Sequence, residues 1–423
     1  MTHAYDYVKG LITCPQKCEL TQISDHCSDI NNQAFSHFLS QSPWDYRSLR
    51  NWLREVGSRF IGKNGALVID ECGNPKAGSK SVGVRRQYLG NIGKVDNGQV
   101  GVFLAYVKQG TRLLLDFRLY LPKSWSSDPK RCEDAGIPSN EQVFRTKAEL
   151  AYEMIVEAVN AGIHFSHICM DGFYGSQPWL LTKLEEMNLI YVADIGSKVY
   201  AYLTEPVYSV PLRKGSRGKE PSRKNVFNTC RVRVDNIVKT ITHWKHVRIR
   251  KSMGGFLEVK FTVIKVWRID KEISKPLPVW LLIRKELDDS DIKYSFCNAL
   301  AIQSWDRLAK MQSERYWIER SFQDAIAIAG MADYQVRNWK AWHHHMSLVL
   351  FAMFWITKEQ CVLLKEVNEV SLPDMVKIII LLVPPKVQTC LTVAKRILKN
   401  IRNRRDSRKS KMKRKNRVTL SST

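Results

Sequence analysis

No apolar run in the 423-residue sequence is long enough to cross a membrane as a helix. The longest run, MSLVLFAMFWI at positions 346–356, has about half of the ~20 residues that a spanning helix needs. The first ten residues, MTHAYDYVKG, have no basic segment followed by an apolar core, so they predict no secretory signal peptide. These absences predict a cytoplasmic protein that does not use a membrane.

Cysteine is present but lacks the spacing of a disulfide framework. The ten cysteines are scattered from position 14 to position 390, as the reduced thiols of a cytoplasmic protein are. Cys14, Cys18, His26 and Cys27 lie close enough in sequence to suggest zinc, but their spacing fits no common zinc finger. We therefore expect no structural metal in this segment.

Acidic residues are scarce relative to basic ones. There are 41 Asp and Glu against 66 Lys and Arg, which gives a net charge of +25 at pH 7. Such an excess predicts a polyanionic partner, because each phosphate that a Lys or Arg neutralises releases condensed counterions. Nucleic acid is the first expectation and an anionic membrane surface is the second.

The basic C-terminal tail explains only half of this charge. From Lys395 to Arg417, 13 of the 23 residues are Lys or Arg and Asp406 is the only acid, so the rest of the chain carries about +13. The tail is expected to be either an arm that adds non-specific affinity or a solubilising terminus.

Short apolar runs and amphipathic stretches alternate through the middle of the chain. Three runs have the pattern of buried strands: GALVID (65–70), QVGVFLAYV (99–107) and TRLLLDFRLYLP (111–122). The Gly- and Lys-rich stretch 72–98 predicts a loop or an irregular hairpin. A capping box of Thr146 and Glu149 then begins a helix. The strand HICMD, a helix and the strand LIYVADIG follow, which together predict an α/β domain with a mixed sheet.

After this domain the pattern changes twice. Residues 200–294 alternate apolar and polar positions like half-solvated strands, which predicts a β-rich insertion. The chain then returns to helix, with an apolar stripe that includes Ile318, Phe322 and Ala325 and with Glu319 at the edge of the stripe.

Three acids occupy related positions in these elements. Asp70 ends GALVID, Asp171 ends HICMD, and Glu319 lies on the late helix. Each alone is more often a cap or a surface residue. If the two strands pair, however, Asp70 and Asp171 are neighbours at the edge where open sheets bind ligands, and a helix across that edge adds Glu319. Three carboxylates with a positive chain favour two Mg²⁺ or Mn²⁺ ions acting on a phosphodiester.

Around these residues the sequence resembles the bacterial insertion-sequence DDE transposases, whose RNase H-like catalytic domain carries a Tyr-Arg-Glu-Lys signature. Six ordered blocks between about residues 35 and 350 carry the resemblance: LVIDECGNPKAGSKSVGVRRQYLGNIGKVDNGQVGVFLAY, DFRLYLPKSW, AGIPSN with FRTKAELA, DGFYG, SERYWIERSF and DYQVRNWKAWHHHMSL. The implied fold is α/β, with an RNase H-like mixed-sheet core, a β-rich insertion, a helical N-terminal region and a basic helical C-terminal segment.

The resemblance implies five parts in the chain. They are an N-terminal DNA-end-binding region (1–62), the first part of the core (63–199), the insertion (200–294), the second part of the core with the glutamate helix (295–358), and the C-terminal segment with the basic tail (359–423).

Carried over position by position, the resemblance makes Asp70, Asp171 and Glu319 the catalytic ligands of two Mg²⁺ ions, with Mn²⁺ as a possible substitute. Arg315, four residues before Glu319, matches the signature arginine and would face the DNA phosphates. The implied reaction is nicking at the insertion-sequence ends, followed by attack of the freed 3′ hydroxyl on target DNA. Two protomers on a pair of double-stranded DNA ends are implied, at the bacterial nucleoid in the cytoplasm.

Two further features are expected to contact DNA. In hairpin-forming members of the family, a tryptophan in a Trp-Leu-Leu strand stacks on a flipped base, and VWLLIR places Trp280 at that position. The alternative is that Trp280 is a core residue of its strand. The stretch just beyond Asp70 carries basic residues that either follow phosphates or belong to a solvated loop: Lys76, Lys80, Arg85 and Arg86.

Two positions depart from the signature. Gln312 stands at the tyrosine position and Ile326 at the lysine position. These departures support an alternative function, a DNA-binding protein that has lost catalysis and acts as a repressor. The intact set of three acids argues against this alternative. A protein without catalysis has no need for three acids that converge in a basic cleft, because they would repel the DNA that it binds. A nuclease of the same fold that cuts without joining is the other alternative.

Secondary candidates are assigned structural roles. Glu71 follows Asp70, and successive strand residues face opposite ways, so only one of the two can point at the metals. Asp194 ends the strand YVAD and is expected to be structural. His343, His344 and His345 project about 100° apart on a helix, so they cannot share one ion.

Overall fold

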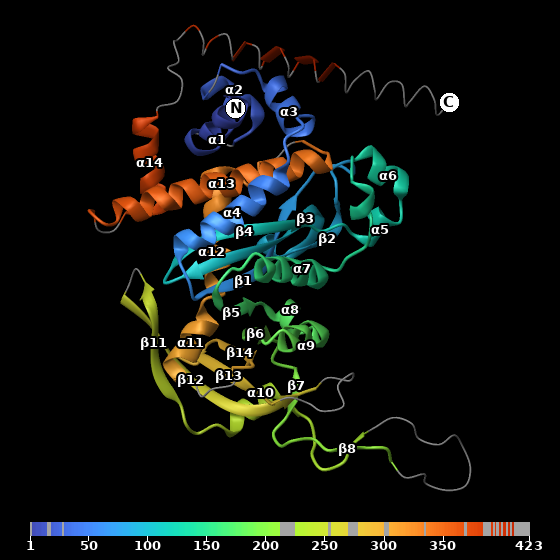
Figure 1. The fold of residues 1–423 in the computed structure, drawn as a ribbon, viewed down its shortest axis with the longest axis vertical. Helices are drawn as coiled ribbons and strands as arrows, with labels where there is room; N and C mark the ends of the chain where they lie inside the picture. Colours follow the sequence, from blue (N-terminus) through green and yellow to red (C-terminus); the bar gives the residue numbers. More distant parts are fainter. Residues whose placement is uncertain are drawn as a thin grey trace.

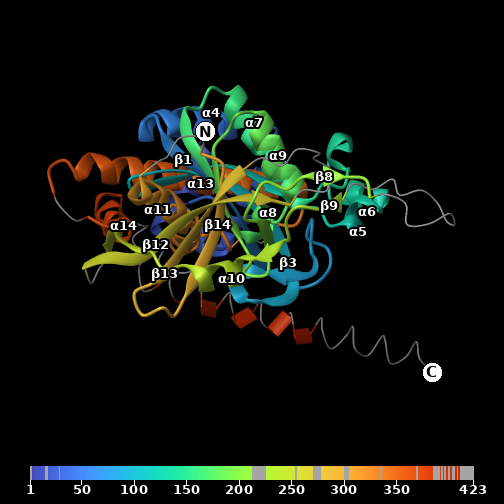
Figure 2. The ribbon, with the colours of Figure 1, turned by 90° about the horizontal axis from the view of Figure 1, so that it is seen from below.

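One large mixed sheet with helices on both faces organises the protein (Figures 1 and 2). The computed structural model describes residues 2–14, 18–27, 29–211, 225–252, 255–269, 278–299, 304–333, 336–367, 370–383 and scattered positions from 391 to 409. The strands are β1 (Gly65–Pro75), β2 (Arg85–Leu89), β3 (Lys94–Lys108), β4 (Thr111–Leu119), β5 (Phe165–Met170), β6 (Tyr191–Ile195), β7 (Tyr200–Tyr202), β8 (Tyr208–Ser209), β9 (Asn225–Val226), β10 (Val232–Arg233), β11 (Lys245–Ser252), β12 (Gly255–Arg268), β13 (Pro278–Glu286) and β14 (Ile292–Cys297). The helices are α1 (Thr2–Thr13), α2 (Leu20–His26), α3 (Asn32–Ser40), α4 (Tyr46–Ile61), α5 (Lys123–Ser126), α6 (Pro129–Asp134), α7 (Lys147–Asn160), α8 (Gly172–Gly175), α9 (Pro178–Glu186), α10 (Val234–Ile237), α11 (Trp305–Ser313), α12 (Tyr316–Ala329), α13 (Trp339–Leu363) and α14 (Leu372–Leu382).

The core of the sheet has the order β4-β3-β1-β5-β6. β1 pairs antiparallel with β3, β3 pairs antiparallel with β4, and β5 runs parallel to both β1 and β6. Consecutive β1 residues identify the two faces: Asp70 meets Arg315 at the start of α12, whereas Glu71 meets Lys147 of α7. The order and the helices on both faces agree with the RNase H-like mixed sheet expected from the sequence.

The β-rich region after residue 200 continues this sheet. β14 pairs antiparallel with β6, and β13 and β12 follow, so the strands extend the core sheet and share its hydrogen-bonding network. β11 and β7 complete the region by pairing with β12. The expected β-rich character is therefore observed. The division of the chain into five functional parts stays a prediction.

The ends of the chain agree in part with expectation. α1 to α4 make the first 62 residues helical, and a capping box of Thr146 and Glu149 begins α7 as predicted. Most of the basic tail from Lys395 onward lies outside the described residues.

The prediction that Asp70 ends its strand is wrong. β1 continues to Pro75, because β3 pairs with it along its whole length as far as Gly98. The stretch 72–98 is accordingly the end of β1, the loop 76–84, the strand β2 and the start of β3. β2 and β3 pair antiparallel, so the irregular hairpin that was one of the two expectations is present. On the other side of β1, the pairing with β5 stops at Ile69. Asp70 therefore has no partner strand on that side, although β1 continues past it.

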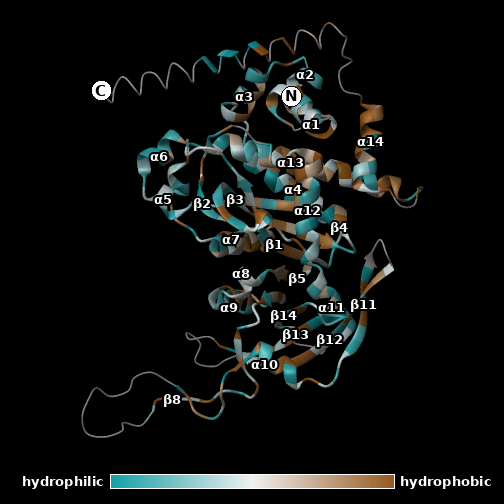
Figure 3. Ribbon diagram, turned by 180° about the vertical axis from the view of Figure 1, so that it is seen from behind, coloured by the Kyte–Doolittle hydropathy of each residue, from teal (hydrophilic) through white to brown (hydrophobic). Residues whose placement is uncertain are grey.

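α13 is longer than the apolar run 346–356 suggested. Among the residues that the structure describes, it is the one helix long and apolar enough to cross a membrane. It packs against α1, α3, α4, α12, α14 and β4, and 56% of its most apolar window is buried. Figure 3 shows apolar residues gathered along α13 and α14. This burial is that of a core helix, and length and composition alone are weak evidence for a membrane span.

The three histidines of α13 have separate partners. His344 lies between two backbone carbonyl oxygens, with Nδ1 2.8 Å from Leu39 O and Nε2 2.9 Å from Trp44 O. Nδ1 of His345 is 2.8 Å from the hydroxyl of Tyr7. These bonds tie α13 to α1, to α3 and to the loop before α4.

Acidification is expected to weaken the folded state through these histidines. Burial lowers the pKa of His344 and of His345 to about 4, against ~6.5 in an unfolded chain. Between these values the unfolded chain binds more protons, so the free energy of unfolding should fall by about 1–2 kcal/mol per histidine from pH 7 to pH 5. Urea unfolding of the protein and of His345→Asn at both pH values tests this. Equal pH dependence in the two proteins would contradict it.

Candidate active site

Asp70 and Asp171 lie side by side on neighbouring strands. The parallel register of β1 and β5 pairs Ile69 with Met170, so the next residue of each chain segment is one of the two aspartates. Adjacent strands are ~4.8 Å apart. The expectation that their strands pair and bring these acids together is therefore met, at the point where β5 ends.

Asp171 also caps a helix. Its Oδ1 accepts hydrogen bonds from the backbone N–H groups of Phe173 and Tyr174, at 3.0 and 3.2 Å, at the start of α8. The cap holds the side chain at the sheet edge. Capping and membership of the carboxylate cluster are therefore compatible at this residue.

Arg315 joins the third carboxylate to the cluster. Its Nη2 is 2.7 Å from Oε1 of Glu319, one helical turn along, and its Nη1 is 3.4 Å from Oδ2 of Asp70. Its Nε is 3.0 Å from Oδ2 of Asp194. One guanidinium thus reaches carboxylates from β1, β6 and α12.

The cluster carries more negative charge than its arginine neutralises. The pKa of Asp70 is raised to about 8, first by burial and then by the charge of Asp171. Burial is also the first cause of the raised pKa values of Asp171 and Asp194. The donor atoms are all carboxylate oxygens, which suit Mg²⁺ or Mn²⁺. The side chains present therefore fit a divalent cation, because the charge of a bound cation would favour the ionised form of these buried carboxyl groups.

The cluster opens into a cleft of about 850 Å³ between the sheet edge and α12. The four acids and Arg315 line it together with Glu71, Cys72, Tyr88, Gly90, Asn91, Gly172, Phe322, Gln323 and Ile326. The lining of the cleft thus holds five acids and one arginine.

Sequence reasoning missed part of this site. Asp194 was expected to be structural, but it shares the cleft and pairs with Arg315. A signal was present, because YVAD has the same form as HICMD and its strand runs parallel to β5. Behind Asp194, Ser295 and Gln312 continue the network, at 2.6 Å from Ser295 Oγ to Asp194 Oδ1 and 2.8 Å from Gln312 Nε2 to Ser295 Oγ. Ser295 lies 101 residues from Asp194, so no local pattern indicated it.

Glu71 points away from Arg315, as expected for the residue after Asp70. Its Oε1 is 2.6 Å from Nζ of Lys147, and its Oε2 accepts a hydrogen bond from the Tyr174 hydroxyl at 3.0 Å. Both partners lie on the α7 and α8 face of the sheet. Glu71 therefore has a structural ion pair, and Asp70 is the member of the pair that faces Arg315.

The basic residues beyond Asp70 divide into two groups. Lys80, Arg85 and Arg86 are exposed. Lys76 is half-buried, and burial lowers its pKa to about 8, partly offset by Asp333. Three of the four basic residues are therefore placed on the surface where phosphates can reach them.

Trp280 is not brought to the carboxylates. Trp280 on β13 pairs with Cys297 on β14, which in turn pairs with Val192 on β6. Trp280 is therefore level with a residue two positions before Asp194, toward the other end of β6. Its indole N–H donates to the backbone carbonyl of Ala299 at 2.9 Å, and the side chain is half-buried against the core. Its place in the fold is that of a strand residue that packs on the core.

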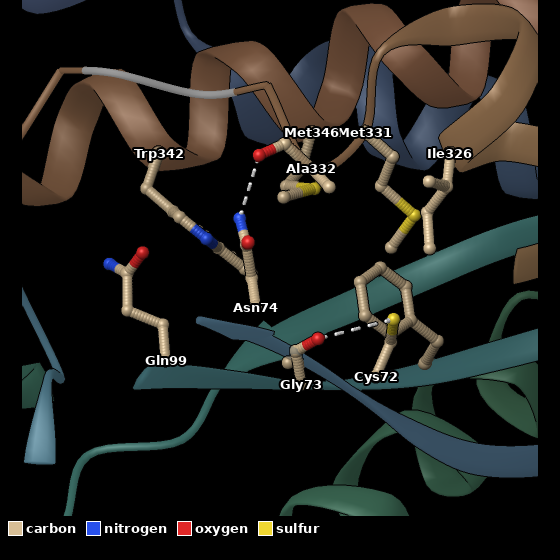
Figure 4. Close-up of a pocket in the computed structure, with 11 residues that line it drawn as sticks. Cys72, Gly73, Asn74, Gln99, Ile326, Met331, Ala332, Trp342 and Met346 are labelled. Carbon is tan, nitrogen blue, oxygen red and sulfur yellow. Dashed lines mark hydrogen bonds between the residues drawn. The ribbon is translucent and has the colours of Figure 1, made fainter. Parts of the chain in front are cut away.

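Ile326 separates the cleft from a small apolar pocket. It lines both, and Figure 4 shows its side chain beside Met331, directed toward Cys72 of β1. Asn74 closes the pocket by donating to the carbonyl of Ala332 at 3.2 Å. The lysine position of the signature is therefore filled by a packing residue.

A second group of possible metal ligands lies beneath the cleft. Among the described residues, His167, Cys169 and Glu314 are the one group of three whose ligand atoms lie within 4.8 Å of one another. Nε2 of His167 is 2.9 Å from Oε2 of Glu314, and Cys169 donates to the carbonyl of Met311 at 3.3 Å. These contacts do not by themselves require a metal ion, and we assign none here.

Comparison with known proteins gives one family and one curated relative. The sequence profile of a family described as DDE superfamily endonuclease matches residues 1–255. A protein described as a probable transposase for insertion sequence element IS701, from Microchaete diplosiphon, is 35% identical over 200 residues, which are 47% of this chain. The match spans half of that relative's length. The NurA nuclease from Sulfolobus solfataricus aligns over 77% of this chain and 95% of its own, with 12% identity and a TM-score of 0.26, which is too low to support an argument.

Proposed function

The chain belongs to the DDE superfamily endonucleases, and on that basis we propose that it is a DNA transposase that cuts insertion-sequence ends and joins them to target DNA. The observation that carries the proposal is the convergence of Asp70, Asp171 and Glu319 with Arg315 in one cleft. A net charge of +25 supports a DNA partner.

Asp70, Asp171 and Glu319 would hold two Mg²⁺ ions, with Mn²⁺ as a substitute. Such ions supply charge stabilisation at the attacking and leaving oxygens of a phosphodiester. Asp171 is held in place by its cap on α8, and Asp70 by the pairing of β1 with β3 on one side and β5 on the other. Arg315 would bind a phosphate oxygen with its Nη groups and so orient the scissile strand.

The assembly that we propose is a homodimer on two double-stranded DNA ends, acting in the bacterial cytoplasm at the nucleoid. Cutting and joining both ends requires one active site at each end. The helical region 1–62 is proposed to recognise the ends. The base-stacking role of Trp280 gains no support from its place in the sheet, so it is not part of this proposal.

Strand-transfer product separates the proposed transposase from a nuclease that only cuts. Labelled end DNA and a supercoiled plasmid should give a labelled, joined plasmid in the presence of Mg²⁺. Cut ends without any joined product would favour the nuclease. Binding without cutting would favour the repressor that Gln312 and Ile326 leave open.

Removing the exposed basic residues beyond Asp70 is expected to weaken DNA binding without changing sequence preference. Phosphate contacts position the duplex but read no bases. Replacing Lys80, Arg85 and Arg86 by alanine should lower affinity for specific and scrambled DNA alike. It should also reduce the slope of log affinity against log salt by about two to three units. Fluorescence anisotropy at several salt concentrations measures both, and an unchanged slope would show that these residues do not contact phosphates.

A further inference from the structure

We propose that Asp194, Ser295 and Gln312 form a buried hydrogen-bond chain that positions Arg315 in the carboxylate cluster. The inference rests on the proposed function of the cleft. It assigns a role to Gln312, the residue that replaces the signature tyrosine, to Asp194, and to Ser295, which no local sequence pattern indicated.

The hydrogen-bond chain begins at Gln312 in α11. Gln312 is 4% exposed, and its Nε2 donates to Oγ of Ser295 at 2.8 Å. An amide nitrogen can only donate a hydrogen bond. The hydroxyl of Ser295, which is fully buried on β14, therefore keeps its own hydrogen for another acceptor.

That acceptor is Asp194. Ser295 Oγ donates to Asp194 Oδ1 at 2.6 Å, across the antiparallel pair of β14 and β6. Ser295 thus fixes the carboxylate of Asp194, and Gln312 fixes the hydroxyl of Ser295. Because hydrogen bonds to an ionised acceptor are stronger than neutral ones, the whole chain favours the charged form of Asp194 in one orientation.

Asp194 then fixes Arg315. Its Oδ2 is 3.0 Å from Nε, the nitrogen on the inner edge of the guanidinium, whereas Asp70 and Glu319 contact the two Nη groups. A partner on Nε sets the plane of the guanidinium while leaving the Nη groups free to exchange partners. Asp194 thus keeps Arg315 directed into the cleft when Asp70 and Glu319 bind metal ions in place of the Nη groups.

A metal-ligand role for Asp194 fits the contacts less well. Its two oxygens are both engaged, Oδ1 by Ser295 and Oδ2 by Arg315. Asp70 differs, since its Oδ1 accepts only from the adjacent backbone N–H of Glu71 at 2.7 Å, and Arg315 contacts its Oδ2 at the longer distance of 3.4 Å. Asp194 is therefore a positioning residue that acts through Arg315.

The direct test is the NMR signal of the Arg315 Nε–H group, assigned by its loss in Arg315→Lys. In the whole protein without DNA this proton should exchange slowly with water. Asp194→Asn and Ser295→Ala should accelerate its exchange, whereas Ser295→Thr, which keeps the hydroxyl, should preserve the slow exchange. Ser321→Ala is the matched control, because it removes a buried hydroxyl of α12 that donates to the carbonyl of Trp317 at 2.8 Å. Slow exchange that persists in Asp194→Asn would overturn the proposal.

Cutting rates test the same chain by a second route. Asp194→Asn and Ser295→Ala should each slow cutting by roughly 10- to 100-fold, the range found when residues that orient a functional group are removed. The variant Asp194→Asn with Arg315→Ala should cut no more slowly than Arg315→Ala alone, because both changes remove one function. Additive losses would overturn the proposal.

Mn²⁺ titration without DNA separates positioning from metal binding. Asp194→Asn should bind Mn²⁺ as the unaltered protein does, whereas Asp70→Asn should not. Weakened Mn²⁺ binding in Asp194→Asn would make Asp194 a ligand and overturn the proposal. If the unaltered protein cuts no DNA but the Nε–H signal responds as expected, the positioning chain stands and the proposed transposase function fails.

Discussion

Asp70→Asn is expected to make the metal-free protein more stable and to abolish its stabilisation by Mg²⁺. Asp70 is buried beside Asp171, and its pKa is raised to about 8, above the ~3.9 of an unfolded chain. The unfolded state therefore releases this proton more readily, and the carboxyl group destabilises the fold increasingly as pH rises from about 4 to 8. Asparagine has a similar shape and no charge. We expect a gain of about 1–3 kcal/mol at pH 8, after allowing for the lost contact with Arg315.

The matched control is the same substitution at Asp116 on β4. This residue is fully buried, whereas the side chain of Asp70 is 13% exposed, and it is surrounded by arginines, with contacts of 3.4 Å to Arg50, 3.1 Å to Arg54 and 2.6 Å to Arg118. Asp116→Asn leaves buried positive charge without its partner and should cost about 3–5 kcal/mol. Thermal unfolding with and without MgCl₂ measures both variants. A loss of stability in metal-free Asp70→Asn, or an undiminished Mg²⁺ effect in it, would contradict the account of the cluster.

Asp171→Asn is expected to reduce DNA cutting by about a thousandfold or more while leaving the fold and DNA binding intact. The substitution is informative because Asp171 has two roles. Asparagine accepts the same backbone hydrogen bonds that cap α8, so the structural role is kept. Only the charge that would hold a cation is lost. Electrostatic stabilisation of the transition state by a bound metal is worth several kcal/mol. Because each 1.36 kcal/mol changes the rate tenfold, losing about 4 kcal/mol slows cutting about a thousandfold.

Single-turnover cutting of labelled end DNA measures this loss, with affinity followed in parallel. Glu319→Gln serves as a companion, because Glu319 is the most exposed acid of the cluster and its side chain is 47% exposed. It should lose cutting with little change in stability. Cutting by Asp171→Asn within tenfold of the unaltered protein would show that Asp171 is a cap and no more.

Much of the fold could be predicted from the sequence, because strand patterns and helix caps are local. The strands that carry Asp171 and Asp194, and the capping box of α7, follow from residues within a few positions of each other. The extension of β1 beyond Asp70 could not be predicted in this way. It depends on pairing with β3 over a Gly-rich stretch whose composition resembles a loop.

The candidate site was predictable only in its outline. Asp171 directly follows the end of β5 and Glu319 lies on a helix edge, which are positions that local patterns reveal, whereas Asp70 lies inside β1. The network behind them depends on contacts between distant strands, such as Ser295 with Asp194, and these have no local signature. Gln312 looked like a lost signature residue, yet its buried amide donates into this network. A departure from a family pattern can therefore carry a contact of its own.

The most direct test of the account is cutting by the purified protein of DNA that carries the ends flanking its gene. Scrambled ends and EDTA serve as controls. A transposase should give breaks at the ends that require Mg²⁺ or Mn²⁺ and that are absent with EDTA and on scrambled DNA. Tight, end-specific binding without any break under either metal would contradict it and would make the protein a DNA-binding repressor.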